Sequence, residues 1–131
     1  MNTKLDKILA EISAGELVDK ITILEIKKNK VPDENKLKEI DKELNSLDDT
    51  MNKFIKDKSK ILTFKDQLKE INLKLWDIED SKRTCEKNND FGKNFVELAR
   101  NVYKFNDERA KIKLKINQIL GSNIKEVKSH F

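Results

Sequence analysis

The stretch from Phe91 to Leu120, FGKNFVELARNVYKFNDERAKIKLKINQIL, decides the fold of this chain. Its seam positions recur at alternating intervals of four and three residues: Phe91, Phe95, Leu98, Val102, Phe105, Arg109, Ile112, Ile116 and Ile119. An average spacing of about 3.5 residues is typical of a helix that packs along another helix in a left-handed coiled coil. Gly121 follows where a left-handed residue commonly ends a helix. The pattern predicts one long amphipathic helix over residues 91–120.

Apolar periodicity also divides the rest of the chain. It predicts further helices over about residues 14–30, 33–61 and 64–88, a short leader helix over residues 1–12, and a tail over residues 121–131. Ser13 and Glu16 form a capping box for the first long helix, and Thr63 and Asp90 are placed to cap the last two. Because the links are short, neighbouring helices should be antiparallel. We expect a single all-α domain, either an antiparallel bundle or long helical hairpins with coiled-coil-like seams.

The composition agrees with long amphipathic helices. Charged residues make up 40% and apolar residues 37% of the 131 residues, with three glycines and one proline. The 28 basic residues are interspersed with 24 acidic ones, which leaves a net charge of +4, and only three of the basic residues are arginines. We therefore expect no nucleic-acid partner. No segment approaches the length of a membrane span and the first residues lack a secretory signal, which favours a cytoplasmic location. A single cysteine, Cys85, and a single histidine, His130, exclude an internal disulfide and a cysteine-based zinc site.

Several seams are narrow for a globular bundle. A narrow apolar stripe covers one partner helix but leaves little to pack against a second. We therefore expect self-association, most simply as a dimer, to complete the core.

Arg109 occupies a seam position where an apolar residue is expected, and Asn106 lies one turn before it on the same face. A charge in such a place must be paired or must face a ligand. One interpretation is a buried arginine paired with a carboxylate, which would fix the register of the helices. The other is that Arg109 and Asn106 bind a small anionic ligand such as a phosphate or a carboxylate.

The partner of Arg109 depends on how the last two helices face each other. If they form a hairpin folded near residue 89, the pairs expected first are Glu70 with Arg109 and Glu79 with Arg100. In this register LWDIED and Arg109 are offset along the hairpin by about seven residues, roughly 10 Å, and a helix from elsewhere, such as the turn at residues 16–19, could bridge that offset.

Acidic residues gather at two places that could hold Mg²⁺. Glu16 and Asp19 lie one helical turn apart, and Glu79 and Asp80 follow Trp76 in the motif LWDIED. Pairs of carboxylates on facing helices hold Mg²⁺ against a triphosphate in helical nucleotide pyrophosphohydrolases. The simpler interpretation is that acids in a first helical turn complement the helix dipole and that Glu79 and Asp80 form surface ion pairs with Arg83.

The motifs GELVDKITILEIKK, LWDIED, DFGKNFVELARNVYKFNDERAKIKLKIN and GSNIKEVKS together resemble a family of short bacterial and phage helical proteins that is catalogued as a domain of unknown function. The resemblance covers about residues 13–129 and is weakest over residues 36–66. It implies no activity, but it does imply an association with glycosyltransferases and surface-polysaccharide genes. Ser81 and Lys82 depart from the family pattern. The matching positions are Gly15, Glu16, Asp19, Lys20, Trp76, Glu79, Asp80, Asp90, Phe91, Gly92, Glu97, Arg100, Tyr103, Asn106, Asp107 and Arg109.

Two classes of function follow. The first hypothesis is a non-enzymatic helical binding or accessory module without a cofactor, linked to glycan or polysaccharide biosynthesis, that binds a second copy, a partner protein or a small anionic ligand. Its candidate pocket consists of Trp76, Glu79, Asp80, Arg100, Tyr103, Asn106 and Arg109. The alternative is a Mg²⁺-dependent nucleotide pyrophosphohydrolase-like enzyme, with metal ligands Glu16, Asp19, Glu79 and Asp80 and with Lys20 and Arg109 on the phosphates. A helical dimer resembling chorismate mutase is disfavoured because the chain has only three arginines.

Overall fold

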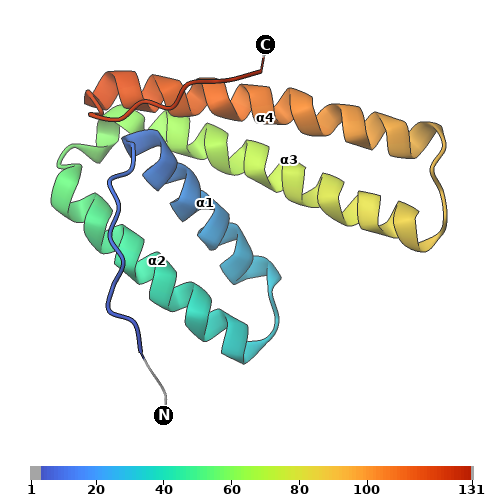
Figure 1. Cartoon of the computed structure of the whole chain (residues 1–131), viewed down its shortest axis with the longest axis horizontal. Helices are drawn as coiled ribbons and strands as arrows, with labels where there is room; N and C mark the ends of the chain where they lie inside the picture. Colours follow the sequence, from blue (N-terminus) through green and yellow to red (C-terminus); the bar gives the residue numbers. More distant parts are fainter. Residues whose placement is uncertain (1–3, 131) are drawn as a thin grey trace.

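The computed structural model describes residues 4–130, which form four long helices and no strand. In chain order these are α1 (Ala14–Lys30), α2 (Glu34–Phe54), the short 3₁₀ helix η1 (Lys58–Ile61), α3 (Leu62–Lys87) and α4 (Lys93–Leu120) (Figure 1). The predicted all-α helical bundle is therefore confirmed. None of the helices in this part of the chain is both long enough and apolar enough to cross a membrane.

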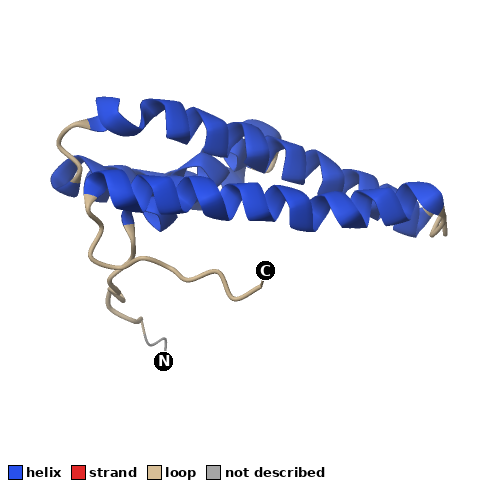
Figure 2. Ribbon diagram, turned by 90° about the horizontal axis from the view of Figure 1, so that it is seen from above, coloured by secondary structure: helices blue, strands red, loops and turns tan. Residues whose placement is uncertain are grey.

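The helices form two hairpins of unequal length. Figure 1 shows α3 and α4 side by side as a long hairpin, while α1 and α2 form a shorter one. Helix α1 crosses the part of the long hairpin that is nearest to the start of α3 and packs on both of its helices, and α2 packs on α1. The half of the long hairpin nearest the loop at residues 88–92 therefore extends past α1 and α2, and Figure 2 shows the same extension from above.

The core lies where α1 crosses the long hairpin. Val18 and Ile21 of α1, Leu68 of α3 and Ile116 of α4 are fully buried there, together with Ile61 at the end of η1. Each of these side chains buries apolar surface, and this burial stabilises the folded state by roughly 25 cal/mol per Å². Packing of α1 into this core places its buried polar residues between α3 and α4.

Only some of the predicted helix caps occur. The Ser13 side chain accepts a hydrogen bond from the Glu16 backbone N–H, as predicted, but the Glu16 carboxylate binds lysines, so only half of the capping box is present. Thr63 lies inside α3, which begins without a side-chain cap. Asp90 accepts from the Gly92 N–H at 3.3 Å, yet α4 itself begins without a side-chain cap.

The predicted leader helix is wrong where it can be checked. Residues 4–12 form no helix, and residues 1–3 lie outside the described part of the chain. Leu5, Ile8 and Leu9 point into solvent. An amphipathic segment this short does not repay the cost of helix nucleation in water unless its apolar face is covered.

The predicted helix over residues 33–61 is also too long. Helix α2 ends at Phe54, and the chain turns through η1 before α3 begins. Ile55 and Ile61 are both buried in the core, and a continuous straight helix would carry them away from it. At the other end of the last helix, Gly121 adopts the predicted left-handed conformation with φ of 63°.

Candidate functional site

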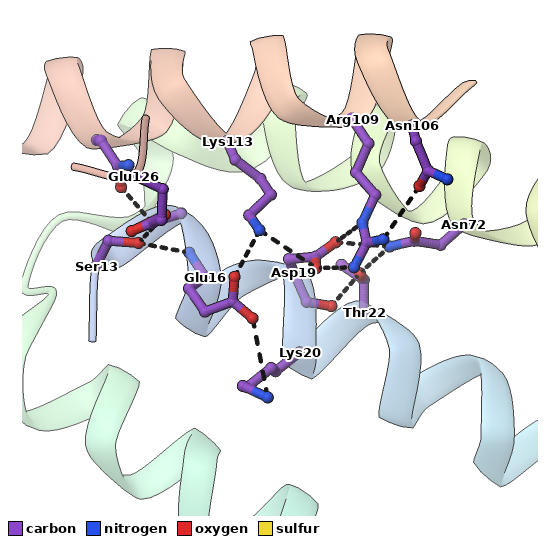
Figure 3. A network of polar contacts seen from close by, with 12 residues as sticks. Ser13, Glu16, Asp19, Lys20, Thr22, Asn72, Asn106, Arg109, Lys113 and Glu126 are labelled. Atoms are coloured by element: carbon purple, nitrogen blue, oxygen red, sulfur yellow. Dashed lines mark hydrogen bonds and ion pairs between the residues drawn. The ribbon is translucent and has the colours of Figure 1, made fainter. Parts of the chain in front are cut away.

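The Asp19 carboxylate lies at the centre of a polar network that joins α1, α3 and α4 (Figure 3). Its side chain is 0% exposed. Arg109 donates to it twice, from Nε to Oδ1 at 2.9 Å and from Nη2 to Oδ2 at 2.5 Å. Paired hydrogen bonds of this kind between a guanidinium and a carboxylate are among the strongest in proteins. The misplaced charge of the α4 seam is thus paired with a carboxylate, as one of the two interpretations predicted.

Asn72 connects the same carboxylate to α3. Its Nδ2 donates to Asp19 Oδ1 at 2.9 Å and to Thr22 Oγ1 at 3.0 Å. The Thr22 hydroxyl in turn donates to the Asp19 backbone carbonyl at 2.7 Å. Asn72, Thr22 and Asp19 are all buried, so these bonds replace water that each group lost on folding.

Lysines extend the network along α1. Lys113 lies 2.5 Å from Glu16 Oε2 and 3.9 Å from Asp19 Oδ2. Lys20 lies 3.8 Å from the other oxygen of Glu16, one turn along the same helix. The two carboxylates of the first turns of α1 are therefore neutralised by Arg109 and Lys113 of α4.

The start of α1 touches α4 through Gly15. The Gly15 backbone N–H donates to Asn117 Oδ1 at 2.6 Å. A Cβ atom at residue 15 would overlap the Lys113 backbone carbonyl and would lie 2.9 Å from Asn117 Oδ1. A glycine is required here because the two helix backbones approach too closely for any side chain. This close approach brings the short Asp19 side chain within reach of Arg109.

A second set of contacts fixes the chain just before α1. Ser13 Oγ donates to Glu126 Oε1 at 2.6 Å, and Ser122 Oγ accepts from the Ala14 N–H at 3.0 Å. Asn123 Nδ2 also donates to Glu11 Oε2 at 2.6 Å. The tail after α4 is thereby attached to the N-terminus of α1.

The environment of Arg109 stabilises its charged form. Hydrogen bonding to Asp19 raises the pKa of the guanidinium above its ordinary value, partial burial opposes this, and the charges of Asp19 and Glu16 increase it further. Arg109 Nη1 also donates to Asn106 Oδ1 at 3.3 Å. Arg109 therefore remains charged and cannot act as a general base. The arrangement is suited to holding three helices in one register.

A protein-family model matches most of the chain. The model of a family of unknown function, DUF6165, matches residues 8–130. The chain belongs to the DUF6165 family. The predicted resemblance to a family of unknown function is therefore confirmed. No curated protein and no solved structure matches the chain.

The DUF6165 match includes every residue of the polar network, from Ser13 to Glu126. The residues of the candidate pocket differ in their surroundings. Arg109 and Asn106 lie together at the network, whereas Glu79, Asp80 and Arg100 are exposed. Tyr103 is exposed as well, and Trp76 is half-buried on α3.

Both ion pairs expected for the long hairpin are wrong. Arg109 binds Asp19, and Glu70 lies 3.7 Å from Lys74 of its own helix. Glu79 binds Arg83 at 3.1 Å, which is the surface pair that the simpler interpretation gave it, and not Arg100. The hairpin register alone could not predict the true partner, because it comes from a third helix.

The acids proposed as metal ligands lie on separate elements and do not form one cluster. Within residues 4–130, no three His, Cys, Asp or Glu side chains are grouped so that they could hold a metal ion. Glu16 and Asp19 are engaged with cations of α4, and Glu79 is engaged with Arg83. If the protein binds Mg²⁺, these carboxylates must first leave their present partners.

Sequence reasoning missed Asn72, Thr22, Lys113 and Asn117, which complete the network. One signal was present for the main pair. Asp19 lies among Leu17, Val18 and Ile21 in a helix with a broad apolar face, so it needed a buried cation as much as Arg109 needed a buried anion. Matching these two misplaced charges would have identified the pair.

Helix α4 carries a second line of residues that α1 covers only in part. This line also alternates between intervals of three and four: Val96, Ala99, Tyr103, Asn106, Ala110, Lys113 and Asn117. Its last part contacts α1 at Gly15 and Glu16. Its first part lies beyond α1, where Val96 is 51% and Tyr103 is 54% exposed. We call Val96, Ala99 and Tyr103 the uncovered line.

Proposed function

We propose that this DUF6165 protein is a non-enzymatic helical binding module that recognises the apolar face of another helix. The observation that carries this proposal is the uncovered line of α4. It continues, without a break in spacing, the line of α4 that α1 already covers. A helix lying beyond α1 would therefore follow the same line of α4, but it would meet apolar side chains where α1 meets Lys113 and Asn117.

The chemistry of the neighbouring residues supports binding in preference to catalysis. Asp19 and Arg109 are engaged with each other, and Arg109 holds its proton. Apolar side chains, by contrast, are left half-exposed on the hairpin at Phe91, Val96 and Tyr103. Exposed apolar patches often mark sites of protein–protein contact, where aromatic residues are enriched.

The biological setting rests on the family resemblance. That resemblance implies an association with glycosyltransferases and surface-polysaccharide genes, and on this basis we propose an accessory role in glycan or polysaccharide synthesis. A cytoplasmic location is part of this proposal.

Photo-crosslinking in the native host tests the binding surface. A photoreactive benzoylphenylalanine replaces Val96, and a matched control places it at Lys42, which is exposed on α2. We expect adducts with another protein, or with a second copy of this chain, from position 96 and not from position 42. Adducts from neither position, or equal adducts from both, would overturn the proposal.

Ligand screening tests the enzymatic alternative and the small anionic ligand. Purified protein is heated with nucleotides, sugar nucleotides and carboxylates, with and without Mg²⁺. A ligand at a hundred times its Kd stabilises the folded state by about 2.7 kcal/mol, which is readily detected. Turnover that is lost in Arg109→Lys would contradict the binding proposal and favour the Mg²⁺-dependent pyrophosphohydrolase-like enzyme, because lysine keeps the charge but not the paired hydrogen bonds.

A further inference from the structure

The segment before α1 has the pattern of a helix without being one. Residues 4–12, KLDKILAEI, are here called the N-terminal arm. Leu5, Ile8, Leu9 and Ile12 have the spacing that places apolar residues on one face of a helix. Their exposed fractions are 77%, 83%, 88% and 39%, and the arm is not helical. Within residues 4–130, the side chains that would form the apolar face of a helical arm are therefore left exposed to solvent.

The base of the arm is fixed. Ser13 is buried, caps α1 and binds Glu126, and Glu11 accepts a hydrogen bond from Asn123. The arm cannot extend α1 as one continuous helix without breaking the Ser13 cap. If it becomes helical, it must do so as a separate unit on a surface that accepts its apolar face.

The uncovered line of α4 matches the arm in length. Val96 and Tyr103 are seven residues apart, as are Leu5 and Ile12. At about 1.5 Å per residue, both apolar faces span roughly 10 Å when helical. Figures 1 and 2 show that the arm leaves the helices at the end of the long hairpin opposite its loop. In this conformation the arm therefore does not reach the uncovered line of its own hairpin.

Resting on the binding role proposed above, we propose that the uncovered line of α4 binds the N-terminal arm of a second copy of this chain, and that the arm folds into a helix as it binds. Each copy carries one arm and one uncovered line of matching length. Two copies can therefore exchange arms about a twofold axis, which is the symmetry that closes such an interface. Stable dimers typically bury about 1,200–2,000 Å² in total, and the exchange forms two arm contacts where a one-sided contact forms one.

Sedimentation equilibrium of the full chain over a wide range of concentrations is the first test. We expect a monomer–dimer equilibrium. The helical signal in circular dichroism should increase with protein concentration as the fraction of dimer increases. Leu9→Asp in the arm and Val96→Asp in the uncovered line should each raise the dimer Kd at least about tenfold, since each places a charge in the contact. Leu62→Asp is the matched control, because Leu62 is 58% exposed but lies at the start of α3, at the opposite end of the long hairpin from the uncovered line. Circular dichroism of dilute samples checks that every variant is folded.

Mixing the two variants tests the geometry. In a homodimer of either variant, both contacts contain one defective surface. In a mixed dimer, the intact arm of Val96→Asp meets the intact uncovered line of Leu9→Asp, so one contact is whole. We therefore expect the mixture to associate more strongly than either variant alone.

A wild-type chain that is monomeric at all concentrations would overturn the inference, as would a mixture no more associated than its parts. A monomer whose helicity falls in Leu9→Asp would show instead that the arm folds onto its own chain, which also overturns it. The proposed binding function fails on a different observation, the absence of adducts from position 96. A monomeric protein that still crosslinks to another protein would therefore refute the exchanged arms alone.

Discussion

Replacing Arg109 with alanine should destabilise the protein strongly without any change in its apolar core. Asp19 is 0% exposed and would lose both hydrogen bonds from the guanidinium. It would keep the bond from Asn72, and Lys113 would remain 3.9 Å away. The substitution therefore leaves a buried carboxylate without its main counter-charge.

The magnitude follows from the geometry of the pair. Removing one partner of a buried ion pair costs about 3–5 kcal/mol. Two features favour the lower end of this range. The Arg109 side chain is 28% exposed, so water can enter the space that it leaves, and Lys113 supplies a second positive charge. We expect a loss of about 3 kcal/mol, a large share of the 5–15 kcal/mol by which domains are typically stable.

This loss is measured by urea unfolding, which is followed by circular dichroism and by the fluorescence of the single tryptophan, Trp76. Arg100→Ala is the matched control, because Arg100 is the same residue type on the same helix but is exposed. The control should change the unfolding free energy by less than about 0.5 kcal/mol. A loss of less than about 1 kcal/mol in Arg109→Ala would refute the argument that this network holds α1 against the long hairpin.

Three further substitutions or conditions examine the same region. The double variant Asp19→Leu with Arg109→Met should recover most of the stability lost in Arg109→Ala by urea unfolding, because apolar replacement of a buried pair is often neutral or favourable; a double variant no more stable than the single one would contradict this. In Gly15→Ala the added methyl group overlaps the Lys113 carbonyl, which should cost about 1–3 kcal/mol of unfolding free energy and lower the melting temperature by several degrees. Gly92→Ala is the control and should leave the melting temperature nearly unchanged, because residue 92 has no close backbone contact. Because the folded-state pKa of Arg109 is raised, its stabilising effect is fully present below the unfolded-state value and is lost only as the pH rises through the folded-state value. The stability difference between wild type and Arg109→Ala should therefore be equal, within about 0.5 kcal/mol, at about pH 6 and about pH 9; a difference that vanishes at the higher pH would contradict the assignment.

Much of the fold follows from local pattern. The seam of α4 and the glycine at residue 121 predicted a last helix over residues 91–120, and α4 spans Lys93–Leu120. Ser13 likewise predicted the start of α1, because its side chain can reach the Glu16 N–H within one turn. These features depend on residues that are close in sequence, so sequence alone was sufficient to predict them.

The wrong predictions share a physical cause, which is tertiary contact. Spacing predicts that residues 4–12 could be helical, but a helix forms only where something covers its apolar face. Helix α2 ends early because Ile55 and Ile61 turn into a core that other helices create.

The candidate site was predicted only in part for the same reason. Arg109 was identified as a misplaced charge that needs a partner, and it has one. Glu70 was predicted as that partner from the register of the long hairpin alone, but the true partner, Asp19, lies on α1. Gly15, through its contact with Lys113 and Asn117, determines where α1 crosses, and no periodicity reports the position of such a crossing.

The attachment of α1 to the far end of the chain also has a consequence for synthesis on the ribosome. The Ser13–Glu126 bond joins residues 113 positions apart, and the Asp19–Arg109 pair joins residues 90 apart. Helix α1 is made before the other three helices, yet it cannot settle between α3 and α4 until most of α4 has emerged. During that interval the apolar residues of α1 have only α2 to cover them, and Asp19 must stay hydrated. The first helix to be synthesised is thus among the last to reach its final place, which makes the nascent α1–α2 hairpin the stage at which this protein is most exposed to misfolding and to chaperones.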